Sequence, residues 1–575
     1  MSKALRKQLS ARAELAPLSD EESLALTQDL QPRRLQDSLL PSTPTHPSLL
    51  ATTGPTVVEL PAQQRPPAGA VLLGTVGTKP KRAWRPSPKK LWLTEEGLLR
   101  QTLMVGNIGA GRTETLLTLG LNTTNTPEQS PGTPVRERSV FFLNAYGDNS
   151  LYFKTLSGLS QQGRAGNLRV INLMTGGRSS PIEGLKLSHS VDLFDGFDET
   201  MLGRWLVNMV PAQLLATPGR ERLSQVLMPT VARLAVALAH QKQCRITVRL
   251  LAQLMSPDGV LEQVNNLKGE DGHLARQWHA HNWGPNAEDK RASFLKDYQG
   301  WLTVPFQDLD HVFESPQPEV SLAQLGGVGN GSPHQLYVLV LAPALERKLD
   351  QLRMLTRSLL TSLRLSLEQR TETAACDTVA IFDEFEHCFD DRDIVAMAGL
   401  QNRGCGVVWA AEQPRATQKK NVLETCAAKP ATHVMMSQDF RAQYGGALQA
   451  EYLNWQRQQL PNLDLPTEKV FQALAPGQGF VWNAHQVWPM TMDYISPGRL
   501  RTSFITHCRP LPFGSYKRSS AGMARLDPER QTQVLKQRLA ERSEDGGPSL
   551  AWCQETVARM LGFASWHEAH QKLAK

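Results

Sequence analysis

The sequence predicts an α/β protein whose mostly parallel sheet is interrupted by an all-α insertion. Short, wholly apolar runs alternate with helical segments, and such runs are missing from about residue 196 to 330. Strands buried on both faces consist almost wholly of Val, Ile, Leu and Phe, and parallel neighbours are joined by long crossovers, usually helices. The expected strands are Thr102–Val105, Val140–Leu143, Leu168–Leu173, Gln335–Leu341, Thr378–Phe382, Gly406–Ala411, His433–Met436 and Gly479–Trp482.

The first 65 residues lie outside this pattern. Prolines such as Pro32, Pro44 and Pro61 punctuate a Ser/Thr-rich stretch that cannot hold a long helix or a central strand. We expect residues 1–65 to be a disordered tail or a docking arm that folds on a partner. A basic cluster from Lys79 to Lys90 follows, and it either contacts nucleic-acid phosphates or forms a solvated loop.

We expect three further parts between residues 66 and 508, namely two parts of one α/β domain and a helical insertion between them. Residues 66–195 form the first part of the α/β domain, 196–330 the insertion, and 331–508 the second part of the domain. Within that second part, leucines at helical spacing predict an amphipathic crossover helix over Asp350–Leu367. The segment 509–575 is basic and helical, and it forms either an interaction module or a structural cap.

Composition excludes several classes of protein. The chain has 575 residues with a net charge of +7, and 41% hydrophobic residues rule out a wholly disordered chain. Seven cysteines without CxxC spacing argue against a zinc module and against a disulfide framework. No apolar run approaches the ~18–20 residues that cross a bilayer, and the N-terminus lacks a secretory signal, so we expect a soluble cytoplasmic protein.

The strongest motif follows the first expected strand of the parallel sheet. It reads Gly106-Asn-Ile-Gly-Ala-Gly-Arg-Thr-Glu114, which has the spacing of a phosphate-binding P-loop. Glycines let the backbone curl so that its N–H groups face phosphate oxygens, and the following helix N-terminus favours the same anion. The candidate nucleotide-binding residues are Gly106, Asn107, Ile108, Gly109, Ala110, Gly111, Arg112, Thr113 and Glu114, with Thr113 as a Mg²⁺ ligand. A glycine-rich structural turn is the alternative.

Arg112 stands where a P-loop has lysine. A guanidinium is larger than an ammonium, planar and forked, so the exchange is not conservative. Nucleotide binding with slow turnover, binding without turnover, and no binding all remain open at this stage.

A second motif supplies the acidic half of such a site. The apolar run Thr378–Phe382 ends in Asp383 and Glu384. In P-loop ATPases an aspartate at this point holds Mg²⁺ and a neighbouring carboxylate polarises the attacking water. Glu386 extends the site or lies beside it, and His387 reads best as an ordinary loop histidine.

Two further residues complete the candidate set. Gln413 follows the strand Gly406–Ala411, where a glutamine would reach the terminal phosphate and its water, unless it is a plain loop residue. Arg403 precedes the same strand and either serves a neighbouring subunit's phosphate or is an ordinary helix-end arginine.

Taken in order, these pieces resemble the TraG/TraD-type coupling ATPases of conjugation and type IV secretion, and most closely their TrbC/IcmO-like (DotL-like) subgroup. The resemblance spans about residues 70–500. It rests on Leu91–Glu95, Met104–Leu117, Gly147–Asn149, Leu341–Glu346, Asp383–Glu384, Gln401–Gly404 and Ala410–Gln413. Arg112 departs from the family lysine, and Asn144 and Tyr146 stand where the family has Asp and Lys.

The resemblance implies a RecA-like P-loop motor domain that binds ATP and Mg²⁺ and assembles into a hexameric ring. Such rings recruit a relaxase–DNA complex or secreted protein substrates to the channel proteins of a conjugative, often plasmid-borne, apparatus. The family's transmembrane helices are not evident, so attachment to the cytoplasmic face of the inner membrane would come through partners. Catalytic roles carried over are those of Asp383, Glu384 and Gln413. A degenerate scaffold and a general DNA translocase are the alternative hypotheses.

Overall fold

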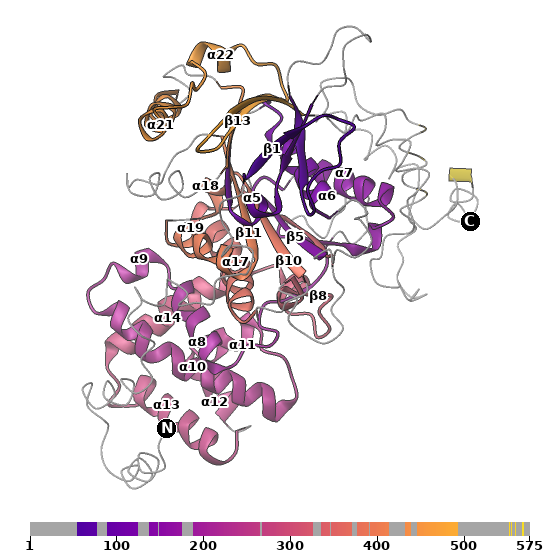
Figure 1. The fold of residues 1–575 in the computed structure, drawn as a ribbon. Helices are drawn as coiled ribbons and strands as arrows, with labels where there is room; N and C mark the ends of the chain where they lie inside the picture. Colours follow the sequence, from indigo (N-terminus) through magenta and orange to yellow (C-terminus); the bar gives the residue numbers. More distant parts are fainter. Residues whose placement is uncertain are drawn as a thin grey trace. The chain divides into compact units, whose positions relative to one another are not determined.

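The computed structural model describes most of the central part of the chain (Figure 1). The ranges are 55–76, 89–107, 109–124, 137–147, 149–174, 188–264, 267–325, 335–344, 347–370, 376–389, 391–412, 432–438, 446–492 and isolated positions near the C-terminus. These residues form two units. The helical unit contains Asp192–Pro318 and Met354–Glu368, and the sheet unit contains the other described segments.

A twelve-stranded sheet forms the core of the sheet unit. Its order is β1-β3-β2-β14-β13-β12-β4-β11-β10-β5-β9-β6. All neighbouring pairs from β12 to β6 are parallel, whereas all pairs from β1 to β12 are antiparallel. In this spatial order the strands are Val57–Leu60, Lys90–Leu93, Val71–Val76, Val487–Thr491, Gln478–Trp482, Thr432–Met436, Gln101–Val105, Cys405–Ala411, Cys376–Asp383, Glu137–Asn144, Tyr337–Leu341 and Leu168–Asn172. A separate two-stranded sheet pairs β7 (Val191–Asp192) with β8 (Val320–Ser321).

All eight strands expected from apolar runs are present, which confirms the α/β fold class. Strands β1, β2, β3 and β14 were not predicted. Partly exposed positions interrupt each of them, as in the alternating pattern of β3, and they belong to the antiparallel part of the sheet. Strand β1 lies inside residues 1–65, which we had expected to lack structure up to residue 65. Its pairing with β3, Val57 opposite Leu93, supplies main-chain partners that composition does not reveal.

One edge of the sheet is covered by side chains. The N–H of Val170 in β6 donates to His189 Nδ1 at 3.0 Å, and the N–H of Asn172 donates to Ser188 Oγ at 3.0 Å. The N–H of His189 in turn donates to Val170 O at 2.6 Å. Residues 188–189 therefore satisfy the outer edge of β6 without adding a strand.

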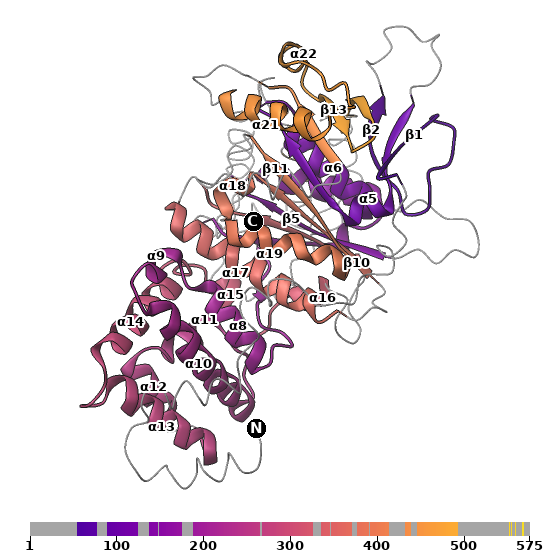
Figure 2. The same cartoon turned by 60° about the vertical axis from the view of Figure 1, so that its left-hand side comes forward.

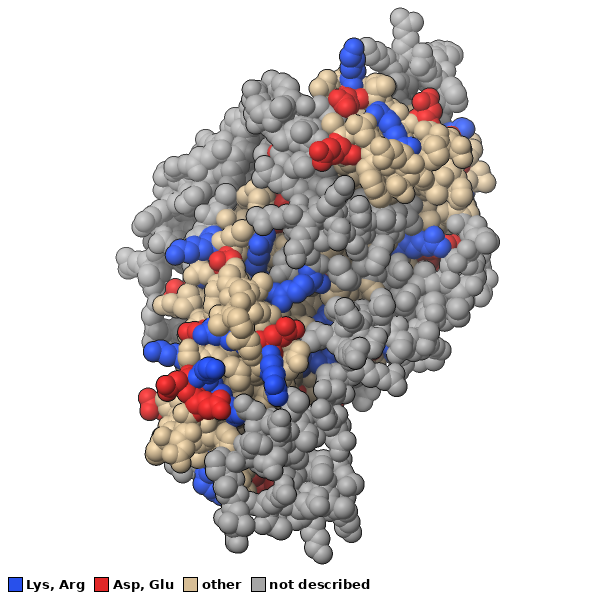
Figure 3. Space-filling view, turned by 90° about the vertical axis from the view of Figure 1, so that its left-hand side faces the viewer, with Lys and Arg blue, Asp and Glu red and all other residues tan. Residues whose placement is uncertain are grey.

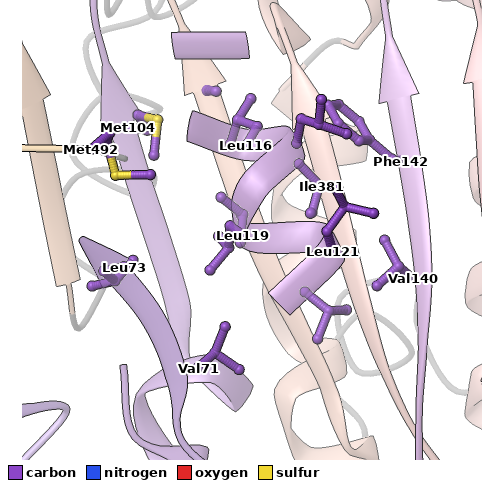
Figure 4. Close-up of a cluster of buried hydrophobic side chains, with 14 of the residues drawn as sticks. Val71, Leu73, Met104, Leu116, Leu119, Leu121, Val140, Phe142, Ile381 and Met492 are labelled. Carbon is purple, nitrogen blue, oxygen red and sulfur yellow. The ribbon is translucent and has the colours of Figure 1, made fainter. Parts of the chain in front are cut away.

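Helix α6 anchors the core of the sheet unit. Leu116 and Leu119 of α6 pack into one buried apolar cluster with Phe142 of β5 and Ile381 of β10 (Figure 4). Gly120 faces the sheet so closely that a Cβ there would lie 2.7 Å from Tyr337 Oη. The helices of this unit are α5 (Glu95–Leu99), α6 (Arg112–Thr124), α7 (Asn149–Gln161), η1 (Ala165–Asn167), α16 (Leu322–Leu325), α18 (Phe385–Cys388), α19 (Asp391–Ala398), η2 (Gly399–Arg403), α21 (Gly446–Gln459) and α22 (Glu468–Gln472).

The helical unit packs around α10 (Figure 2). Its helices are α8 (Glu199–Met209), α9 (Ala212–Leu215), α10 (Arg220–Lys242), α11 (Val248–Gln253), α12 (Pro257–Val264), α13 (Gly269–Trp283), α14 (Asp289–Thr303), α15 (Asp310–Phe313) and, from Met354 onward, α17 (Leu349–Glu368). Trp205 Nε1 of α8 donates to Ser358 O of α17 at 3.3 Å, so α17 is part of this unit's interior.

Among the described helices, α10 alone is long and apolar enough to cross a bilayer by length and composition. The sequence-based expectation considered uninterrupted apolar runs, and in α10 the apolar residues are interrupted by polar and charged ones such as Arg233. The apolar face of α10, including Val231, Leu234 and Leu238, is fully buried within the helical unit. Its apolarity is therefore that of a core helix, and it contains Pro229 and Arg233.

Several sequence-based expectations lie outside the described residues. They concern most of residues 1–65, the basic cluster before Lys89, and the segment 509–575 apart from isolated positions. At the end of that cluster, Lys89 pairs with Glu59 at 2.6 Å and Lys90 lies 5.8 Å from the ring centre of Trp92. Lys89 therefore links the start of β3 to β1, whereas the contact of Lys90 with Trp92 lies within β3.

We expect Gly406→Ala to destabilise the sheet unit. A Cβ at Gly406 in β11 would lie 2.0 Å from Leu98 O of α5, and this main-chain oxygen cannot move aside cheaply. Overpacking of this kind costs about 2–3 kcal/mol. Thermal unfolding of the full chain should show a lower midpoint. Gly166→Ala, which adds its Cβ into open space, is the matched control, and equal midpoints for the two variants would contradict the prediction.

Candidate nucleotide-binding site

The glycine loop runs from the end of β4 to the start of α6, as predicted. The N–H of Gly106 donates to Ala411 O at the end of β11, and the N–H of Asn107 donates to Ser437 O after β12, both at 3.2 Å. Gly109 and Gly111 have φ of +81° and +88°, a conformation that residues with a Cβ avoid. No atom lies within 4 Å of a Cβ built on Gly109, so the described surroundings of the loop are open there.

The acidic strand tip meets this loop. Asp383 is the last residue of β10, which is separated from β4 by β11, and all three strands are parallel. Thr113 Oγ1 donates to Asp383 Oδ2 at 2.7 Å, and Asn144 Nδ2 donates to the same oxygen at 3.1 Å. Two motifs that lie 270 residues apart are thus in direct contact.

Arg112 fills the space between the two motifs. Its Nε donates to Asp383 Oδ1 at 3.0 Å, its Nη1 donates to Gly106 O at 2.7 Å, and its Nη2 pairs with Glu384 Oε1. Only 4% of the side chain is exposed. Although burial alone would lower the pKa of Arg112, the charges of Asp383 and Glu384 raise it. The guanidinium is therefore a fixed cation directed toward the acidic residues.

Glu384 is held in an unusual conformation. Its φ is +57°, in the left-handed region, and its N–H donates to Ala410 O at 2.8 Å. Such backbone costs about 1–3 kcal/mol and is frequent at functional sites. Burial raises the pKa of Glu384 to about 8, against the opposing effect of Arg112. Within the described part of the chain, Glu384 Oε2 is buried and has no hydrogen-bond partner.

Residues next to Asp383 and Glu384 make further contacts with the ends of neighbouring strands. Glu386 Oε1 accepts the N–H of Glu412 at 3.0 Å, and burial raises the pKa of Glu386 to about 7. His387 Nε2 lies 3.2 Å from Tyr146 Oη, and the two rings pack edge to face. Sequence analysis noted Asn144 and Tyr146 only as departures from a family pattern. Their contacts depend on the pairing of β5 with β10, where Asn144 lies opposite Asp383, and no local motif encodes that pairing.

The other predicted residues lie farther away or outside the described ranges. Arg403 precedes β11, at the amino ends of the parallel strands, whereas the loop lies at their carboxyl ends. Its Nη1 donates to Arg370 O at 3.5 Å. Glu114 pairs with Lys154 of α7. Ile108 and Gln413 lie outside the described residues.

A glycine loop between a parallel strand and a helix, facing an acidic strand tip, defines the class of P-loop α/β proteins. Within that class the chain resembles type IV coupling proteins. It is 30% identical over 128 residues to the type 4 coupling protein DotL of Legionella pneumophila, which confirms the resemblance predicted from the motifs. The match covers 22% of this chain and only 15% of the length of DotL. No family model matches the chain.

The solved structures to which the chain is similar are more distant in sequence. The conjugative coupling protein TrwBdeltaN70 in its unbound form is 13% identical with a TM-score of 0.49, over 80% of this chain and 97% of that one. TrwB in complex with ADP and Mg²⁺ is 12% identical with a TM-score of 0.46, over 75% and 97%. VirB4 of Thermoanaerobacter pseudethanolicus is 14% identical with a TM-score of 0.41, over 76% and 100%.

We expect Arg112→Met to destabilise the sheet unit strongly. The change leaves Asp383 and Glu384 buried without their cation, and breaking a buried ion pair from one side costs about 3–5 kcal/mol. Chemical denaturation of the full chain should show the loss. Arg100→Met is the matched control, because Arg100 pairs with Glu96 near the surface and should contribute at most about 1 kcal/mol. Equal stability of the two variants would mean that the buried ion pairs of Arg112 make no net contribution to the free energy of unfolding.

Proposed function

We propose that this chain is a nucleotide-binding, coupling-protein-like component of a type IV secretion or conjugation apparatus. The observation that carries the proposal is the 2.7 Å contact between Thr113 of the glycine loop and Asp383 of the acidic strand tip. This contact brings both halves of a P-loop site to the carboxyl end of one parallel sheet. The partial similarity to DotL indicates the cellular setting.

The loop fits the phosphates of a nucleotide. Gly109 and Gly111 have left-handed backbone conformations, and the described surroundings of Gly109 leave open space that a phosphate could take. The first N–H groups of α6, beginning with Arg112, have no intrahelical acceptor and are available to an anion. These groups would bind the phosphate chain of ATP or ADP, the cofactor that the motifs predict.

The ion pair with Arg112 limits the proposed role of Glu384 in catalysis. Glu384 would take the proton from water, and its Oε2, which has no hydrogen-bond partner among the described residues, would accept a hydrogen bond from that water. Its other oxygen is held by Arg112, and neutralisation of the carboxylate weakens it as a base. We therefore propose that ATP hydrolysis by this chain is slow.

The partners follow from the resemblance. A coupling protein of this kind would recruit a relaxase–DNA complex or secreted proteins to channel proteins at the cytoplasmic face of the inner membrane. A hexameric ring is part of this proposal, and in such a ring Arg403, at the amino ends of the strands, would serve a neighbouring subunit rather than its own site.

A scaffold without turnover is the second candidate function. The closed ion pairs of Arg112 favour it, because all three nitrogen groups of the guanidinium are already engaged. A general DNA translocase has less support. On the face shown in Figure 3, the described basic side chains are interspersed with acidic ones rather than gathered into one basic patch.

We expect Arg112→Lys to raise ATP hydrolysis by about tenfold or more, because a lysine ammonium can leave the acidic residues and reach the phosphates. Phosphate release by the purified chain, with excess Mg²⁺, measures the effect. Adding Glu384→Gln to Arg112→Lys should remove the gain, since loss of a general base costs about 10²–10⁴-fold.

Arg100→Lys serves as the control for the arginine exchange, because Arg100 lies near the surface and pairs with Glu96. If Arg112→Lys hydrolyses no faster than the parent chain, and neither shows a nucleotide-dependent change in unfolding temperature, the scaffold hypothesis is supported over the ATPase.

A further inference from the structure

The residues present do not fit a P-loop magnesium ion well. Mg²⁺ requires oxygen ligands at about 2.0–2.1 Å and is usually held by one or two carboxylates together with phosphates. Both oxygens of Asp383 already accept hydrogen bonds: Oδ1 from Arg112, and Oδ2 from Thr113 and Asn144. The Thr113 hydroxyl, predicted as a second ligand, donates its proton to the same carboxylate.

The positive charge of Arg112 beside Asp383 and Glu384 also disfavours a divalent cation at this position. The Arg112 guanidinium contacts Asp383 and Glu384 together, which is where a metal would take its negative ligands. Asn144 adds a neutral amide, directly opposite Asp383 in the sheet, rather than another carboxylate. The described cluster therefore consists of the carboxyl groups of Asp383, Glu384 and Glu386, one buried cation and two neutral donors.

A bound metal has two tasks beside a phosphate chain. It neutralises the acidic residues that would otherwise repel the phosphates, and it contributes a positive charge of its own. Arg112 already neutralises the acidic residues, because it pairs with Asp383 and Glu384. Unlike a metal ion, it is part of the chain and cannot dissociate. The second task falls to the N–H groups of the loop and of α6, which do not depend on a metal.

We propose that Arg112 takes the place of the divalent cation, so that this site binds a nucleoside diphosphate without metal. The proposal rests on the proposed function, namely that the glycine loop binds nucleotide. It assigns a specific role to the arginine that departs from the P-loop pattern: it is a built-in counter-ion to Asp383 and Glu384 rather than a phosphate ligand.

The test is calorimetric titration of the full chain with ADP, once in excess EDTA and once in excess MgCl₂. We expect the two Kd values to agree within about threefold, which corresponds to about 0.7 kcal/mol. In Arg112→Lys, whose compact ammonium can leave the carboxylates, MgCl₂ should tighten binding by about tenfold or more. Arg100→Lys, remote from the loop, should behave like the parent chain.

The outcomes separate this inference from the function on which it rests. Binding by the parent chain that is tenfold or more tighter in MgCl₂ overturns the metal-free site but leaves nucleotide binding intact. Equal binding in both conditions by Arg112→Lys overturns the assignment to Arg112. If ADP binds in neither condition, the proposed function itself fails, and the inference fails with it.

Discussion

The buried contact of Arg112 with Asp383 and Glu384 is the interaction on which the site depends. It joins the start of α6 to the tip of β10, and these elements are 271 residues apart in the sequence. Two carboxylates at this depth would be costly without a cation, and the arginine would be equally costly without them. These ion pairs therefore hold the glycine loop against the acidic strand tip and occupy both carboxylates at the proposed nucleotide site.

Strand order makes this contact possible. Because β4, β11 and β10 are parallel neighbours, their carboxyl ends lie at the same edge of the sheet, so the loop after β4 and the acidic end of β10 lie near each other. Gly406 permits β11 to sit close under α5, and Gly120 permits α6 to sit close on the sheet. The site is thus a product of close packing between helices and a parallel sheet, and the two motifs by themselves would not form it.

Much of this arrangement could be predicted from the sequence. Strands buried on both faces leave an unbroken apolar run, and so β4, β10 and β11 were each found, together with the motifs at their ends. The partly exposed strands β1, β2, β3 and β14 were not predicted, because antiparallel pairing leaves only a weak alternation. The orientation of Arg112 could not be predicted either. It depends on which partners the side chain meets in three dimensions, and Asn144 reaches Asp383 only through the pairing of β5 with β10.

The covered edge of β6 limits how copies of this protein can associate. An open outer strand offers main-chain groups to any similar strand, and two sheets can then fuse into a continuous one. Here the side chains of Ser188 and His189 occupy the N–H groups of Val170 and Asn172. A strand from another molecule therefore cannot take the N–H groups of Val170 and Asn172 unless these two side chains move aside.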